Sequence, residues 1–308
     1  MKTESIQEFQ KRRDDVNFSQ LMENEHRLVN CMSLKYENLP NEEVGKWDRN
    51  SIIGNVGFDI FSTNYVDGFN IEKKFMIVNN SGSEVDSYNF WNSIWESGCK
   101  VIVRFDKTSE RRHWLKIFRD SAYAVGEFIV RKKTIPCKYF TQLEITIENK
   151  MERKSRKITH FQYHGCLDNI ASVGCTQLIF FLKMVNKKQS SYLITRTEGR
   201  NSTCGPIVIH SIGCFERAVS ICVLDICLDQ LMKTNSVSVP KVILNIKSQV
   251  SFESISLDEY SFINKTLLRS ICVLNLNDNT STDSDLERAS SMSRIKKYGL
   301  FFKRASVP

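Results

Sequence analysis

The chain of 308 residues lacks the long apolar stretch that a membrane-spanning helix requires. No run of about 18 consecutive apolar residues occurs in it, so we expect no transmembrane segment. Its first residues, MKTESIQEFQKRRDDVNF, contain no apolar core of the kind found in signal peptides, and we therefore expect no secretory signal. These two absences favour a protein that works in the cytoplasm.

The ten cysteines lack the spacing of a metal site or of a disulfide framework. None of them forms a CxxC pair, and none has the spacing typical of zinc ligands. Several, such as Cys222 and Cys227, lie within apolar runs, which is typical of buried, reduced thiols. We therefore expect free thiols, no metal and no cofactor.

The composition is that of a globular protein with a modest excess of positive charge. Apolar residues make up 41% of the chain, which is ordinary for a protein with a real core. The formal net charge of +8 suits a protein that meets acidic ligands such as phosphoproteins or anionic lipid. A solvated basic surface explains the same charge more simply, and we expect no nucleic-acid partner.

Apolar strand-like runs alternate with helical ones along residues 20–272, which predicts a single α/β domain. The expected strands are Lys74–Val78, Lys100–Phe105, Glu127–Lys132, Phe140–Glu148, Lys157–Gln162 and Pro206–His210. The expected helices are Asp86–Glu96, Gly174–Asn186, Arg217–Thr234 and Leu257–Ile271.

The two ends of the chain differ in composition from the central part. Residues 1–19 are charged and are expected to be helical, residues 20–273 form the predicted domain, and residues 274–308 form a flexible tail. The tail is polar over 275–291 and basic with an aromatic cluster over 292–308, which suits weak docking on a partner or an acidic membrane surface. A tail without a docking role is the simpler hypothesis.

The segment 205–219, GPIVIHSIGCFERAV, carries the strongest functional signal. A short apolar strand leads through a turn into an apolar run from Ala218 to Met232, which is typical of a buried helix. Such a turn forms an anion cradle, because the first helical amides are unpaired and the helix dipole favours negative charge there. Arg217 has a planar guanidinium suited to binding two phosphate oxygens, and an ion pair with Glu216 is an equally supported alternative.

This segment resembles the signature of the protein tyrosine phosphatases, which is a strand followed by His-Cys, five residues and Arg. His210 and Arg217 have the family's spacing, but Ser211 stands at the position of the nucleophilic cysteine. A cradle of this kind lowers the pKa of a thiol into the thiolate range, whereas a serine hydroxyl needs an adjacent base. Because His210 supports the loop in that family, the resemblance implies a domain that does not hydrolyse phosphotyrosine. Residues 211–217 are called the signature loop below.

Five further segments match the family in order over about residues 20–272. They are SLKYENLP, TNYVDGF, NFWNSIWE, VIVRFDKTSERRHWLKIF and ITHFQYHGCLDNIAS. The resemblance places Tyr36 where a ring stacks on the substrate phenol, and Asp168 at the general-acid position. A half-buried packing tyrosine, a solvated loop aspartate, a plain loop serine at Ser211 and a buried structural histidine at His210 are the simpler alternatives.

Several residues depart from the family pattern. Cys166-Leu167 replaces the Trp-Pro of the mobile acid loop, and Cys214 and Glu216 stand where the loop has glycines. Ala218 replaces the hydroxyl residue after the arginine, and Ile255 lies near the position of a late glutamine. A carboxylate at Glu216 repels phosphate unless it turns outward or pairs with Arg217.

The resemblance implies a twisted mixed sheet with helices on both faces. Degenerate domains of this kind are similar to the tyrosine phosphatase-like proteins of polydnaviruses (bracoviruses). That similarity implies an inactive homologue in the cytoplasm of an infected host cell, which binds phosphoproteins or phosphatase partners and disturbs phosphotyrosine signalling. An interaction scaffold without phosphate binding, or a residual phosphatase with another nucleophile, are the alternatives.

Overall fold

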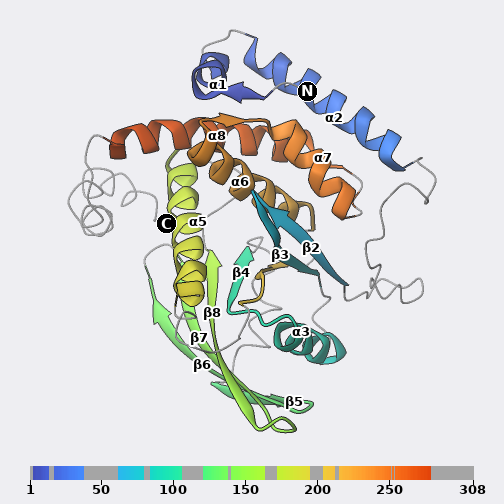
Figure 1. Cartoon of the computed structure of the whole chain (residues 1–308), viewed down its shortest axis with the longest axis vertical. Coiled ribbons are helices and arrows are strands. Elements are labelled where there is room, and N and C mark those ends of the chain that lie inside the picture. The colour runs from blue at the N-terminus through green and yellow to red at the C-terminus, as the bar shows by residue number, and fades with distance from the viewer. Residues whose placement is uncertain are drawn as a thin grey trace, which may run out of the picture.

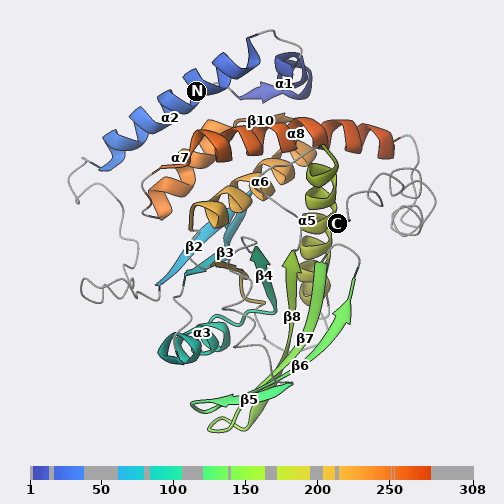
Figure 2. The ribbon, with the colours of Figure 1, turned by 180° about the vertical axis from the view of Figure 1, so that it is seen from behind.

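The computed structural model shows a twisted sheet; among the described residues, most helices lie on one face and α3 (Glu84–Glu96) lies on the other (Figure 1). It describes residues 3–13, 17–37, 62–79, 84–105, 121–137, 140–163, 172–194, 204–211, 215–250, 252 and 254–278. Figure 2, seen from behind, shows the same arrangement of layers. This architecture confirms the predicted single α/β domain.

The main sheet has eight strands in the order β2-β3-β9-β4-β8-β7-β6-β5. Their bounds are β2 Ser62–Gly68, β3 Ile71–Asn79, β4 Val101–Phe105, β5 Ala122–Val125, β6 Phe128–Pro136, β7 Phe140–Asn149, β8 Lys154–Tyr163 and β9 Ile207–Ser211. Strands β3, β9, β4 and β8 are parallel, while β2 at one edge and β7, β6 and β5 at the other pair antiparallel. A small second sheet pairs β1 (Glu4–Ser5) with β10 (Ser236–Val237).

The remaining helices lie on the other side of the sheet from α3. They are α1 Ile6–Arg13, α2 Phe18–Glu37, α5 Ser172–Ile194, α6 Phe215–Thr234, α7 Val239–Gln249 and α8 Leu257–Asp278. No helix in the described part of the chain is both long enough and apolar enough to cross a membrane.

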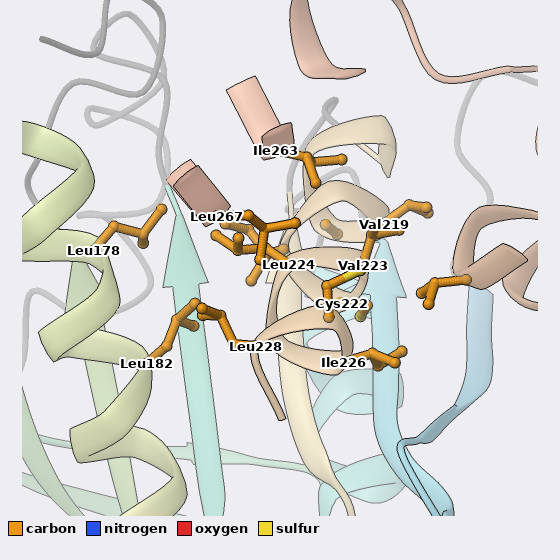
Figure 3. Close-up of a cluster of buried hydrophobic side chains, with 14 of the residues drawn as sticks. Leu178, Leu182, Val219, Cys222, Val223, Leu224, Ile226, Leu228, Ile263 and Leu267 are labelled. Atoms are coloured by element: carbon orange, nitrogen blue, oxygen red, sulfur yellow. The ribbon is translucent and has the colours of Figure 1, made fainter. Parts of the chain in front are cut away.

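Side chains that alternate along the strands divide the core into two clusters. Val101 and Val103 face the helical side, whereas Ile102 between them faces α3. Helix α6 lies at the centre of the larger cluster and is buried nearly all round, as its sequence predicts. In Figure 3, leucines of α5 and α8 converge with those of α6, and a fully buried leucine contributes about 1.5–3 kcal/mol.

Every expected strand and helix overlaps an observed one, but some elements were not predicted. No element was predicted at β2, β5, α7 or the short strands β1 and β10, and only the first residues of α2 (Phe18–Glu37) lie within the segment expected to be helical. The charged N-terminal segment contains α1, and α2 begins at Phe18. Helix α5 continues to Ile194 rather than ending at Asn186, and α8 continues to Asp278, beyond the boundary expected after residue 273.

Candidate functional site

The signature segment forms the predicted strand and helix at the centre of the sheet. Strand β9 lies between β3 and β4 and ends at Ser211, and α6 begins at Phe215. Ser211 is in register with Asn79 of β3. The site therefore lies beyond the carboxyl ends of the parallel strands, where open α/β sheets bind their ligands. Residues 212–214 lie outside the described residues.

Arg217 forms an ion pair with Glu259. The guanidinium Nε in the first turn of α6 donates a hydrogen bond to the Glu259 carboxylate in the first turn of α8. The two side chains are only 14% and 8% exposed, and the guanidinium lies 5.8 Å from the centre of the Phe262 ring. Of the two roles predicted for Arg217, an internal ion pair is present, but its partner is Glu259 and not Glu216.

Glu216 also contacts the start of α8. Its carboxylate accepts a hydrogen bond from the backbone N–H of Ser256, the residue before that helix. Ser256 Oγ in turn accepts the backbone N–H of Glu259 at 3.3 Å. In an ordinary capping box, the glutamate of S-x-x-E accepts the serine N–H. Here Glu216 takes that position, and Glu259 is left to pair with Arg217.

The Glu259 carboxylate is held in a buried environment. Burial raises its pKa above the ordinary value, and the charge of Arg217 and a hydrogen bond with Ser220 oppose that shift. Arg217 therefore helps to keep a buried carboxylate ionised. A phosphate that approached Arg217 would have to share the guanidinium with this existing negative charge.

His210 is fully buried on the α3 face of the sheet. Its ring centre lies 4.9 Å from that of Phe90, and it is in register with Arg104 of β4. Burial lowers the pKa of His210 well below its ordinary value, and the nearby Arg104 and His160 lower it further. The imidazole is therefore neutral at pH 7 and a weak base, as expected of a structural histidine.

The side chains of the other two predicted site residues, Tyr36 and Asp168, lie outside the described part of the structure. Tyr36 lies near the end of α2, and nothing about its side chain is described. Asp168 lies outside the described residues, as do Cys166, Leu167 and Cys214. Their roles remain predictions.

Sequence reasoning missed Glu259 and Ser256 as parts of this site. The sequence S-L-D-E before an apolar run is a readable capping signal, and it marks the start of α8 correctly. What it does not reveal is that this start lies against the first turn of α6.

A cavity of about 870 Å³ lies at the opposite end of β9 from Ser211. It is lined by the β2–β3 hairpin, α5, α6 and the residues just before β9. Lys74 pairs there with Asp225 at 2.5 Å, and Asn186 donates to the other oxygen of Asp225 at 2.5 Å. Within the described ranges, no group of three or more metal-ligating side chains is present here or elsewhere.

Comparison with known proteins identifies the family. The family model described as "Protein-tyrosine phosphatase" matches residues 48–269, which include the main sheet, the signature loop and the start of α8. The chain belongs to the protein tyrosine phosphatase family.

The similar proteins include several bracovirus members of this family. "Tyrosine phosphatase-like protein N3" of Microplitis demolitor bracovirus (isolate Webb) is 41% identical over 318 residues, covering 98% of this chain and 97% of that protein. "Probable tyrosine phosphatase protein N1" of the same virus is 27% identical over 270 residues, covering 79% and 81%. The human "Tyrosine-protein phosphatase non-receptor type 9" is 27% identical over 225 residues, covering 70% of this chain but 37% of the human protein.

Proposed function

We propose that this chain is a catalytically inactive tyrosine phosphatase homologue that acts by binding and not by hydrolysis. The observation that carries the proposal is Ser211 at the carboxyl end of β9, the position at which the resemblance expects the nucleophilic cysteine. A serine hydroxyl does not ionise in an anion cradle as a thiol does, and needs a base within hydrogen-bond reach. The neighbouring His210 is buried and its pKa is well below the ordinary value, so it is a poor base for that purpose.

The contacts of Arg217 support weak phosphate binding at the signature loop. In a phosphate-binding site of this family type, the guanidinium supplies the main positive charge. Here that charge is shared with Glu259, and breaking the pair would leave a buried carboxylate without its partner. This geometry supports weak binding of phosphotyrosine at the loop over its tight capture there.

The bracovirus relatives support a setting for this binding role. We infer that the protein works in the cytoplasm of an infected host cell, where it competes with active phosphatases for phosphoproteins or for their other partners. The effect would be disturbed phosphotyrosine signalling without phosphate release. A scaffold that binds no phosphate is the second candidate, and the Arg217–Glu259 pair is the observation that favours it.

Hydrolysis of an aryl phosphate tests the inactivity directly. Purified protein should release no phosphate above the buffer rate, and Ser211→Ala should behave identically. A rate above buffer that Ser211→Ala abolishes would show that the serine is a nucleophile and would overturn the proposal. A rate that survives in Ser211→Ala would identify another nucleophile and would equally overturn it.

A further inference from the structure

The hairpin tip that joins β7 to β8, residues 149–157 (NKMERKSRK), is strongly basic. The side chains of Lys150, Arg153, Lys154 and Lys157 are exposed. Arg156 instead turns toward the core, where its guanidinium lies 4.4 Å from the Trp95 ring centre and donates to the Trp95 carbonyl at 2.6 Å. Lys150 and Arg153 lie in the turn and Lys154 and Lys157 at the start of β8, so the hairpin tip carries four exposed cations.

The carboxylate of the hairpin tip and two carboxylates on nearby segments form contacts with neighbouring groups. Glu152, the acidic residue of the tip, accepts a hydrogen bond from the Trp95 indole at 2.6 Å and pairs with Lys154 at 3.2 Å. These contacts lower the pKa of Glu152, and the hydrogen bond from Trp95 makes the largest contribution. Glu148 pairs with Arg131 at 2.8 Å, and Glu127 accepts the hydroxyl of Tyr88 at 3.3 Å. The positive charge of the hairpin tip is thus only partly offset.

The backbone of the hairpin tip is fixed by local hydrogen bonds. The Asn149 side-chain oxygen accepts the backbone N–H groups of Met151 at 2.9 Å and Glu152 at 3.0 Å. Arg153 has a φ of 52°, the left-handed conformation of a tight turn. A turn held in this way has an ordered backbone before any partner arrives, which lowers the entropic cost of binding.

Met151 stands at the apex of this turn with 82% of its side chain exposed. Among the large apolar side chains of the described residues, the next most exposed is Leu28 at 60%. One exposed apolar residue is ordinary on a protein surface. An apolar residue at the apex of a fixed turn, with two exposed cations in the turn and two more at the start of β8, is a more specific combination.

The position of the hairpin tip favours a broad surface as its partner. Both views show the β7–β8 hairpin at the lower end of the molecule's longest axis, opposite α1 and α2 (Figures 1 and 2). A convex tip offers little contact area to a folded protein. An anionic bilayer attracts all four cations to its headgroups, and its apolar interior accommodates the Met151 side chain. We propose that the hairpin tip docks this protein on membranes that contain anionic phospholipid.

The expected affinity is weak and dependent on salt. Each cation near an anionic surface strengthens binding by roughly fivefold, and screening by salt weakens each contribution. Four cations with one shallow apolar contact give reversible docking, not stable anchoring, which generally requires a second signal.

Co-sedimentation with vesicles tests the proposal on the full chain. The vesicles are phosphatidylcholine with or without phosphatidylserine, at low and high salt. The test variant is Lys150→Gln/Arg153→Gln/Lys157→Gln, and the matched control Lys11→Gln/Lys187→Gln/Lys265→Gln removes the same charge from exposed positions on three helices. A third variant, Lys296→Gln/Lys297→Gln/Lys303→Gln, removes charge from the tail. Met151→Ser is compared with Met184→Ser, which changes an exposed methionine of α5.

The wild type should bind only the vesicles with phosphatidylserine, and high salt should release it. The hairpin variant should bind on the order of 100-fold more weakly, because three contributions of roughly fivefold are lost. Met151→Ser should also weaken binding, while the helix control and Met184→Ser should bind as the wild type does. Unchanged urea midpoints establish that the variants are folded.

Three outcomes would overturn this proposal. One is a wild type that does not bind anionic vesicles at low salt. If that protein binds polyglutamate in a parallel measurement, its partner is an acidic protein and not a membrane. Another is equal loss in the hairpin variant and the helix control, which would show that net charge alone decides binding. The last is loss in the tail variant with none in the hairpin variant.

Discussion

Arg217 and Glu259 form an ion pair that joins the first turn of α6 to the first turn of α8. Arg217, which the resemblance places at the phosphate-binding position, is thereby paired within the fold. The neighbouring Glu216 reinforces the same junction by accepting the N–H of Ser256. Arg217 and Glu216 thus both link the first turn of α6 to the start of α8.

The Glu216–Ser256 hydrogen bond should contribute measurably to stability. Glu216→Ala removes the acceptor of an N–H at the start of α8 and should lower the free energy of unfolding by about 1 kcal/mol. Glu216→Gln keeps an acceptor oxygen and should lose less. Urea denaturation of the three proteins measures both effects, and two variants as stable as the wild type would show that the bond contributes nothing.

The buried Lys74–Asp225 pair should be costly to break from one side. Their side chains are 8% and 5% exposed, so Lys74→Met leaves a buried carboxylate without its cation and should cost about 3–5 kcal/mol. The double variant Lys74→Met/Asp225→Leu should cost less than the sum of the single variants. A double-mutant cycle from urea midpoints checks this, and additive losses would contradict the predicted coupling.

The buried histidines should make the fold sensitive to acid. Burial, with Arg104 and Lys132 nearby, lowers the pKa of His160 from 6.5 to about 3. The folded state therefore resists protonation while the unfolded state accepts the proton, so stability falls as pH drops from about 6.5 toward 3. The slope should be about 1.4 kcal/mol per pH unit for this one group.

Comparison with a variant isolates this histidine from the other titrating groups. His160→Gln lacks the imidazole that binds a proton in the unfolded state but not in the folded state. Its free energy of unfolding should therefore fall less than that of the wild type between neutral pH and about pH 5. The difference between the two urea series is the quantity of interest. Parallel pH profiles would mean that His160 is protonated in the folded protein, contrary to its lowered pKa.

Ser211→Cys alone should not restore useful phosphatase activity. Thiolate formation needs uncompensated positive potential, and the nearby arginine is paired with Glu259. Phosphate release from a phosphotyrosine peptide should stay near the buffer rate in Ser211→Cys. Activity within about tenfold of an active family member, a barrier difference of roughly 1.4 kcal/mol, would show that the rest of the site is intact.

Local sequence patterns predicted most of this fold but not the contacts of its site. The apolar strand Ile207–Ser211 and the apolar helix α6 follow directly from their residues, because each is buried almost completely. Helix α7 was not predicted from the sequence; its Pro240 lies in the first helical turn, where proline is well tolerated. Strand β5 was missed because AYAV is short and lies at the edge of the sheet.

The pairing partners of charged residues depend on how distant elements pack. Arg217 and Glu259 are separated by 42 positions, and Lys74 and Asp225 by 151. Proximity in the sequence favoured Glu216 as the partner of Arg217, but adjacent residues of a helix point in different directions. Only the packing of α6 against α8 selects Glu259.

The most direct test of the account is a titration of a labelled phosphotyrosine peptide against the wild type, Glu259→Gln and Arg217→Ala. Asp258→Asn serves as the matched control, since it removes a neighbouring exposed carboxylate that is not the partner of Arg217. If the ion pair with Glu259 keeps the Arg217 guanidinium from binding phosphate, the wild type, Asp258→Asn and Arg217→Ala should all bind the peptide weakly. Glu259→Gln should bind about tenfold more tightly or better, because a charge-assisted phosphate bond contributes roughly 1.5–3 kcal/mol. Tight wild-type binding that Arg217→Ala abolishes and Glu259→Gln leaves unchanged would contradict the account.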